Sequence, residues 1–122
     1  MNGNNILVDT NFLIYLLNGR GVVTPYLKNN LFISEITEME MLGVKSLSQE
    51  VFRIRKALIE NCYLVTFNSD IKEIAIQIKQ QTTLKLPDAI AAGSALYMGL
   101  PLVTADKGFS KIAGLHLHLL KL

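Results

Sequence analysis

Ile6-Leu7-Val8-Asp9-Thr10-Asn11 is the stretch that decides the fold, and it runs directly into the apolar segment Phe12–Leu17. The short apolar run predicts a buried strand whose C-terminal end carries Asp9, and the segment after it predicts a helix. Aspartate is a favoured helix N-cap because its carboxylate accepts the free backbone N–H groups of the first turn. Capping therefore explains Asp9 when it is taken alone, and a functional role needs similar acids elsewhere in the chain.

The composition sets limits on the class of protein. The length of 122 residues predicts one domain, residues 1–122, with a single core. Twelve Lys and Arg against ten Asp and Glu give a net charge of +2, too small to indicate nucleic-acid binding by charge alone. The single cysteine, Cys62, excludes an internal disulfide, and residues 1–5 lack a signal-peptide pattern. Glycine and proline interrupt the most apolar region, so we expect a cytoplasmic protein without a membrane span.

Strand and helix signals alternate along the chain. Apolar runs predict strands at residues 6–9, 31–34, 62–67, 102–104 and 115–119. Helices are predicted at residues 12–17, 35–44, 49–59, 70–78 and 84–96, with shorter ones near Pro25 and after Asp106. This order predicts an α/β fold with a mainly parallel sheet, in which functional groups gather beyond the carboxyl ends of the strands.

Four acids are expected to meet at that edge of the sheet. Asp9 and Asp106 each follow a strand, while Glu40 and Asp88 lie near the starts of helices that begin at the same edge. Each has a structural alternative: a cap for Asp9, a Thr37–Glu40 capping box, the helix dipole for Asp88 and a turn for Asp106. Together they would repel one another unless a cation neutralised them.

The chemistry of such a cluster is specific. Carboxylates without nearby Cys or His favour Mg²⁺ or Mn²⁺ over zinc, as one or two ions. Such ions activate water and balance the charge that builds on phosphate oxygens, which suits phosphodiester hydrolysis. We therefore predict Asp9, Glu40, Asp88 and Asp106 as the metal-binding and catalytic residues.

A second possible metal site lies near the C-terminus. Leu115-His116-Leu117-His118-Leu119 alternates strictly, so its leucines are expected to face the core and its two histidines to face outward together. Histidines two apart on one strand face can bind a metal. A half-exposed edge strand explains the same pattern, and no third ligand is near in sequence.

Four motifs taken in order resemble the PIN-domain ribonucleases, above all the VapC toxins of toxin–antitoxin pairs. They are Leu7–Asn11, Ile33-Ser34 followed by Thr37 and Glu40–Gly43, Leu86–Ala92, and Leu102–Phe109. The resemblance covers nearly the whole chain. It implies a three-layer α/β/α fold with a five-stranded, mainly parallel sheet.

The same resemblance implies a function. Asp9, Glu40, Asp88 and Asp106 would be the metal ligands, with Asn11 and Thr104 as polar supports. It also implies RNA cleavage, a homodimer, and an antitoxin whose tail covers the acidic cleft. Ala105 departs from the family, since many relatives have a polar residue before the last acid.

Three alternatives stay open at the level of sequence. A different helix register would replace Glu40 by Glu38. A PIN-like scaffold that binds RNA or protein without cutting it would carry the same motifs. A phosphoryl-transfer domain of the receiver or haloacid-phosphatase type also has Asp after its first strand, although Asn11 stands where that phosphatase pattern has a second acid.

Overall fold

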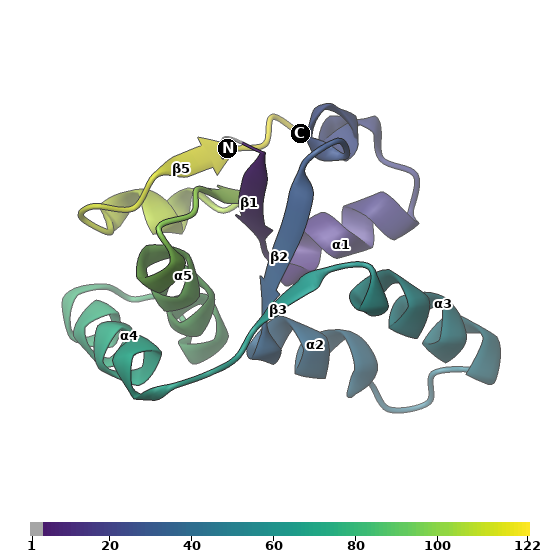
Figure 1. Cartoon of the computed structure of the whole chain (residues 1–122), viewed down its shortest axis with the longest axis horizontal. Coiled ribbons are helices and arrows are strands. Elements are labelled where there is room, and N and C mark those ends of the chain that lie inside the picture. The colour runs from purple at the N-terminus through teal and green to yellow at the C-terminus, as the bar shows by residue number, and fades with distance from the viewer. Residues whose placement is uncertain (1–3) are drawn as a thin grey trace.

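The computed structural model describes residues 4–122, so the first three residues of the predicted domain lie outside it. Its strands form one five-stranded sheet (Figure 1): β1 (Asn5–Val8), β2 (Asn30–Ser34), β3 (Tyr63–Val65), β4 (Leu102–Thr104) and β5 (Leu117–Leu119). The α-helices are α1 (Thr10–Leu17), α2 (Glu35–Leu42), α3 (Gln49–Glu60), α4 (Ser69–Gln81) and α5 (Leu86–Met98). Two 3₁₀ helices complete the chain, η1 (Gly21–Tyr26) and η2 (Lys107–Lys111).

All neighbouring strands in the sheet are parallel, and their order is β3-β2-β1-β4-β5. The chain starts at the centre with β1, proceeds outward through β2 and β3, and then returns to the other side of β1 for β4 and β5. The strand order therefore reverses between β1 and β4, which is the place where parallel α/β sheets usually bind ligands. The predicted α/β class with a five-stranded parallel sheet is confirmed.

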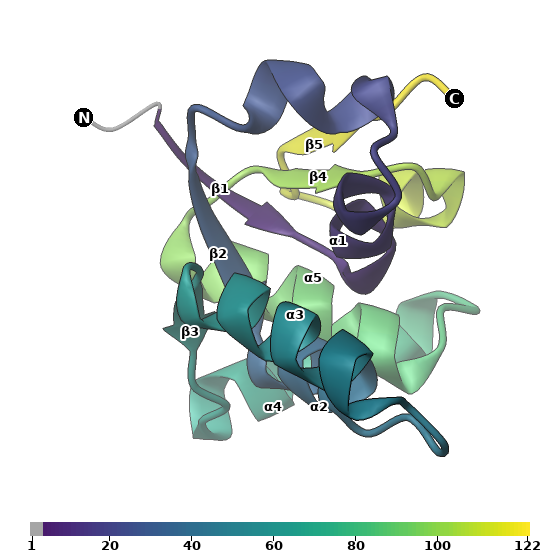
Figure 2. The same cartoon turned by 90° about the vertical axis from the view of Figure 1, so that its right-hand side faces the viewer.

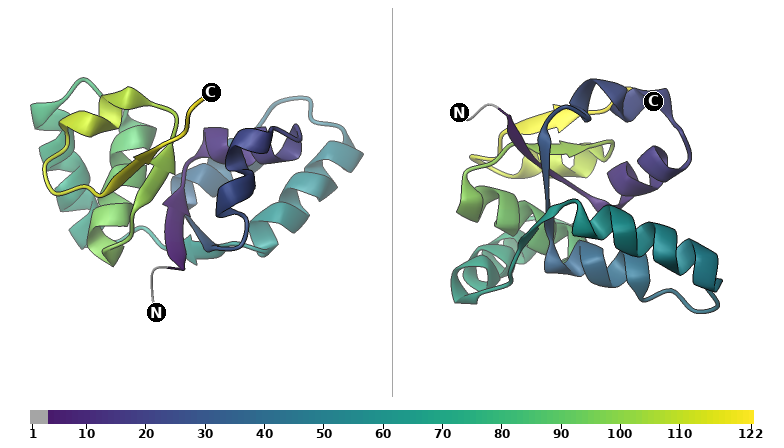
Figure 3. Two further views of the ribbon diagram at one scale, coloured as in Figure 1. Left: turned by 90° about the horizontal axis from the view of Figure 1, so that it is seen from above. Right: turned by 45° about the vertical axis from the view of Figure 1, so that its right-hand side comes forward.

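Helices cover both faces of the sheet, as Figures 1 and 3 show. Alternation along β1 places Leu7 in a core with α4, α5 and η2, and Ile6 and Val8 in a core with α1 and α3. Each side chain of β1 from Ile6 to Val8 is at most 4% exposed. A strand buried on both faces has a continuous apolar sequence, which is why residues 6–8 predicted a central strand.

Helix α2 connects the two sides of the molecule at the carboxyl edge of the sheet. It begins directly after β2, and it contacts both α3 and α5. Figure 2 shows α2 alongside α3. The helix ends at Leu42, two residues before the predicted end, because Gly43 is its C-cap. A Cβ at position 43 would lie 2.6 Å from the backbone oxygen of Met39, so glycine suits this close turn.

The predicted capping box of α2 is wrong. Ser34 caps α2 by accepting a hydrogen bond from the N–H of Thr37, which places Thr37 inside the helix and removes the Thr37–Glu40 capping box. Asn68 caps α4 in the same way, and Asp70 lies in the first turn of that helix. In both helices the polar residue directly before the first helical residue satisfies a free N–H group.

The ends of two strands also differ from the prediction. The third strand is confined to Tyr63–Val65, and the last one to Leu117–Leu119. Leu115 and Leu117 pack against the core as expected, but Leu119 is 38% exposed. Within residues 4–122, every helix is too short or too polar to cross a lipid bilayer.

Candidate functional site

Asp9 lies where the strand order reverses, between the end of β1 and the start of α1. Its side chain is only 7% exposed. Oδ1 accepts a hydrogen bond from the N–H of Phe12 at 3.0 Å, so Asp9 is the N-cap of α1 as predicted. Oδ2 accepts a hydrogen bond from the hydroxyl of Thr104. Burial raises the pKa of Asp9; these two hydrogen bonds oppose the shift, and the charge of Asp106 adds to it.

Thr104 links the first and last of the predicted acids. Its side chain is fully buried at the end of β4, and its Oγ1 accepts a hydrogen bond from the N–H of Asp106 at 3.1 Å. The Asp106 carboxylate then accepts a hydrogen bond from the N–H of Gly108 at 2.8 Å. A Cβ at position 108 would lie 3.1 Å from Oδ1 of Asp106, so glycine permits this close approach.

Glu40 reaches the site from α2. Its Oε1 accepts a hydrogen bond of 2.6 Å from the hydroxyl of Thr10, the first residue of α1. Oγ1 of Thr10 also lies 3.3 Å from Oγ1 of the buried Thr37, one turn before Glu40 on α2. Glu38 points to a different pocket, which it lines together with Met39 and other residues. The helix register therefore brings Glu40, and not Glu38, toward Asp9.

Asp88 lies in the first turn of α5, directly after Pro87. Burial raises the pKa of Asp88, and the charges of Asp106, Asp9 and Glu40 raise it further, in that order of size. The positive charge of Lys85 lowers it. Asp88 is thus close enough to the other three predicted acids to be repelled by their ionised forms.

A small pocket of about 130 Å³ joins three of these acids. Its polar residues come from the starts of α1 and α5 and from α2, and the complete lining is Asp9, Thr10, Asn11, Thr37, Glu40, Pro87, Asp88 and Ala91. Asp106 is outside this lining, although its charge acts on both Asp9 and Asp88. Asn11, predicted as a polar support, is exposed at the mouth of the same pocket.

The donor set fits a hard divalent cation, but the side chains are not arranged as a finished ligand set. In favour, the pocket contains carboxylate oxygens, and the mutual repulsion that raises the pKa of Asp88 is what a bound cation would relieve. Among residues 4–122, however, no three His, Cys, Asp or Glu side chains lie close enough together to hold one ion. Glu40 is held by Thr10, and Asp9 by Thr104 and Phe12.

Sequence reasoning missed three supporting residues. Thr10 and Thr37 line the pocket and orient Glu40, and Gly108 holds the carboxylate of Asp106. A signal for Thr37 was available, because it lies three residues before Glu40 and therefore on the same helix face. Thr10 had none, since its contact with Glu40 joins two helices that are 30 residues apart in sequence.

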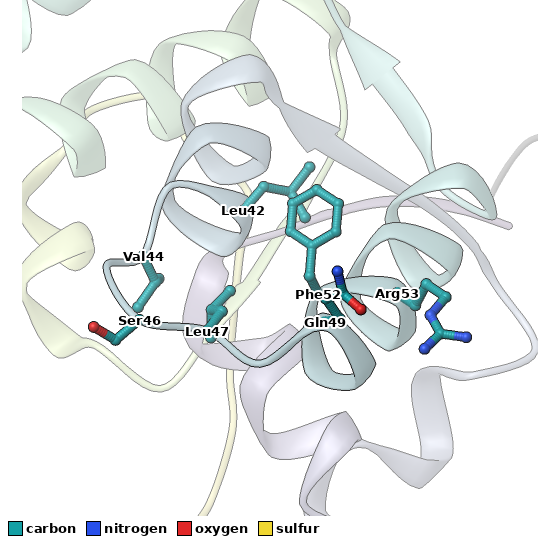
Figure 4. Close-up of a pocket in the computed structure, with 7 residues that line it drawn as sticks. All are labelled: Leu42, Val44, Ser46, Leu47, Gln49, Phe52 and Arg53. Carbon is teal, nitrogen blue, oxygen red and sulfur yellow. The ribbon is translucent and has the colours of Figure 1, made fainter.

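A larger pocket lies elsewhere, between the end of α2 and the start of α3 (Figure 4). It has a volume of about 400 Å³ and is lined by Leu42, Val44, Ser46, Leu47, Gln49, Phe52 and Arg53. Figure 4 shows Phe52 of α3 close to Leu42 of α2. This pocket contains none of the four predicted acids, so it is distinct from the acidic site.

The comparison with protein families gives one match, to the PIN domain, over residues 6–115. No curated protein matches the sequence. Solved structures are similar along nearly the whole chain. A chain in a toxin–antitoxin complex from Klebsiella pneumoniae is 33% identical with a TM-score of 0.77, and the match covers 90% of this chain and 94% of that one.

Two VapBC structures have the same fold at lower identity. VapBC-1 from nontypeable Haemophilus influenzae matches with 23% identity and a TM-score of 0.80, covering 94% of this chain and 97% of that chain. The DNA-bound VapBC from Salmonella typhimurium matches with 23% identity and a TM-score of 0.79, covering 93% and 96%.

This chain belongs to the PIN-domain family, because the PIN-domain match covers most of it. The parallel sheet and the acids at its carboxyl edge agree with this assignment. The relative at 33% identity is a chain of a toxin–antitoxin complex, and the two VapBC structures share the fold. This identification replaces the alternative of a receiver or a haloacid phosphatase.

Proposed function

We propose that this chain is a metal-dependent endoribonuclease and the toxin of a toxin–antitoxin pair. The observation that carries the proposal is the convergence of Asp9, Glu40 and Asp88 on one pocket, with the charge of Asp106 acting on two of them. PIN domains of the VapC type are nucleases, and such nucleases generally use divalent ions, which agrees with an all-carboxylate donor set.

The four acids have different surroundings, which suggests different roles. Asp9 is fixed by two hydrogen bonds and is nearly buried, so it suits a rigid ligand. Asp88 is ionised at a cost because of its burial and the charges of the other three acids, and a nearby cation would relieve that cost. Asp106 is anchored through Gly108 and keeps an unused oxygen for a shared or second ion.

A divalent ion held by these residues would supply an activated water and neutralise charge on the scissile phosphate. With one ion, a carboxylate would stay free to act as general base, and with two ions the acids would share them. Lys85, whose charge acts on Asp88, is available for a phosphate oxygen at the pocket. Thr10 orients Glu40 through Oε1, which leaves Oε2 of the carboxylate for either arrangement.

The remaining assignments belong to the same proposal. The partner is an antitoxin protein, as in the toxin–antitoxin complexes to which this chain is similar. A homodimer is supported by exposed apolar side chains beside α2 and α4, among them Met39, Phe67 and Ile76. A cytoplasmic location follows from an RNA substrate and from the single cysteine.

A second candidate is a PIN-like scaffold that binds RNA or protein without cutting it. One observation favours it: among the described residues 4–122, no three acids lie within reach of one ion. The scaffold predicts that RNA stays intact with any divalent ion. The nuclease predicts that the side chains of Glu40 and Asp88 turn toward an ion when one is supplied.

The deciding experiment incubates total cellular RNA with the purified chain, free of antitoxin, in Mg²⁺, in Mn²⁺ and in chelator. We expect discrete fragments with metal and none with chelator. Asp88→Asn and Asp9→Asn should abolish cleavage while the far-UV circular dichroism stays unchanged. Asp70→Asn is the matched control, because Asp70 is an exposed acid in the first turn of α4 and should leave cleavage intact.

The outcome separates the two candidates. Cleavage that persists in chelator or in Asp88→Asn would overturn the assignment of the site. Intact RNA in every reaction, together with metal-independent RNA binding, would support the scaffold. Cleavage of single-stranded DNA but not RNA would keep the acidic site and change the substrate.

A further inference from the structure

A pair of histidines lies on the edge strand of the sheet, outside the acidic site. His116 and His118 are both exposed, and their ring centroids are 4.9 Å apart with the planes tilted by 48°. They are the only histidines in the chain. Since they flank Leu117, whose side chain packs into the core, both imidazoles project from the opposite face of β5.

The second imidazole is held in place by an aromatic chain that reaches the core. Tyr26 of η1 packs edge-on against His118 with centroids 6.5 Å apart, and Phe12 packs edge-on against Tyr26 at 6.2 Å. Phe12 is fully buried. The orientation of His118 is therefore restricted before any ligand arrives, which lowers the entropic cost of binding.

The pair is also separated from the carboxylates. His118 pairs in register with Val103, and the backbone oxygen of His116 accepts from the N–H of Leu102 at the start of β4. The acids lie beyond the other end of this strand, after Thr104. The two imidazoles are thus attached to the part of the sheet that precedes the acidic edge.

We propose that His116 and His118 form a second metal site, which chelates a borderline transition ion such as Ni²⁺, Cu²⁺ or Zn²⁺. Imidazole nitrogen suits these ions, whereas Mg²⁺ and Mn²⁺ prefer the carboxylates. Ring centroids 4.9 Å apart allow two ring nitrogens to turn toward one ion, with water in the remaining positions. The chain would then sort metals by ligand type, with hard ions at the acids and nitrogen-seeking ions at β5.

Two histidines that share one ion should bind it more tightly than either histidine alone. Once one imidazole is bound, the second binds intramolecularly, so the pair should exceed either histidine alone by at least about tenfold in affinity. Removing either ring should then cost nearly as much as removing both. That pattern distinguishes a shared site from two independent surface histidines.

The test is isothermal titration of the untagged, full-length chain with Ni²⁺, beside retention on an immobilised-nickel column. We expect a Ni²⁺ site whose affinity falls by at least about tenfold in both His116→Gln and His118→Gln. Both side chains are exposed, so these variants should keep the circular dichroism of the unaltered chain.

Two further variants exclude the other donors. Cys62→Ser removes the only thiol, and Asp88→Asn weakens the acidic site; Ni²⁺ binding should persist in both. Unchanged Ni²⁺ affinity in the two histidine variants would overturn the proposal. So would loss of binding in Asp88→Asn, or a loss of less than threefold in each single histidine variant. RNA cleavage is not part of this readout, so the proposal stands or fails independently of the nuclease assignment.

Discussion

The hydroxyl of Thr104 donates a hydrogen bond to Oδ2 of Asp9, across 95 residues of sequence. This bond crosses from β4 to β1, the two strands between which the strand order reverses. The same hydroxyl accepts from the N–H of Asp106. One buried side chain therefore fixes the positions of two acids that come from opposite ends of the chain.

Thr104→Val tests this link, because it keeps the shape of the side chain and removes the hydroxyl. The carboxylate of Asp9 and the N–H of Asp106 would each lose a buried partner, which costs about 1–3 kcal/mol in the free energy of unfolding. The pKa of Asp9 should rise further, since this bond now opposes the effect of burial. Urea unfolding measures the loss. Thr104→Ser restores the hydroxyl and should recover most of the stability, and equal loss in both variants would contradict the role of the bond.

Asp88→Asn should make the metal-free chain more stable near pH 7. In the folded state the pKa of Asp88 lies above its ordinary value of 3.8, so folding opposes the ionised form. This penalty is present above the folded-state pKa and disappears as the pH falls below 3.8, where the acid is protonated in both states. We expect a higher melting temperature at pH 7 and no gain near pH 3.

The control for this prediction is Asp70→Asn, since Asp70 is exposed in the first turn of α4, where a negative charge favours the helix. That variant should gain nothing at pH 7. Addition of Mn²⁺ should raise the melting temperature of the unaltered chain more than that of Asp88→Asn. A less stable Asp88→Asn chain at pH 7 would contradict the expected penalty on the ionised carboxylate of Asp88.

Cys62 should react slowly with alkylating reagents. Burial raises the pKa of its thiol from 9.0 to about 11, and Sγ lies 3.4 Å from the backbone oxygen of Leu58. At pH 8 this shift leaves about 100-fold less thiolate than an ordinary thiol has, and the thiolate is the reactive form. Iodoacetamide labelling followed by mass spectrometry gives the rate, and labelling in 8 M urea is the reference.

The same shift has a consequence for stability. The folded-state pKa of Cys62 is raised, so folding favours the neutral thiol. The free energy of unfolding is therefore unaffected by this group below pH 9 and falls as the pH rises toward about 11. Cys62→Ser should lose less stability than the unaltered chain over this range. Labelling as fast in the native chain as in urea would contradict both expectations.

The sequence predicted the fold well because its signals were local. The continuous apolar run in β1 marked a central strand. The helix predicted at residues 84–96 is α5, which ends two residues later than predicted, at the C-cap Gly99 with its positive φ of 67°. The caps were less predictable. Ser34 and Thr37 are equally good capping residues by type, and only the end of β2 decides which of them starts the helix.

The candidate site was predicted in part for the same reason. Asp9 and Asp106 could be expected to lie near each other because each follows a strand of one parallel sheet. The partners that orient them could not, since the contacts of Thr10 with Glu40 and of Thr104 with Asp9 join elements that are distant in sequence. Thr104 was expected only from the family resemblance, and Thr10 was not expected at all.

The most direct measurement is the rate of RNA cleavage against Mn²⁺ concentration for Glu40→Gln beside Glu38→Gln. The two variants carry the same chemical change two residues apart on α2, but only Glu40 lines the pocket with Asp9 and Asp88. We predict that Glu40→Gln lowers the rate by at least roughly 100-fold and shifts the Mn²⁺ dependence upward, while Glu38→Gln stays close to the unaltered chain. Equal rates in the two variants, or a loss confined to Glu38→Gln, would contradict a metal-dependent nuclease built on these acids.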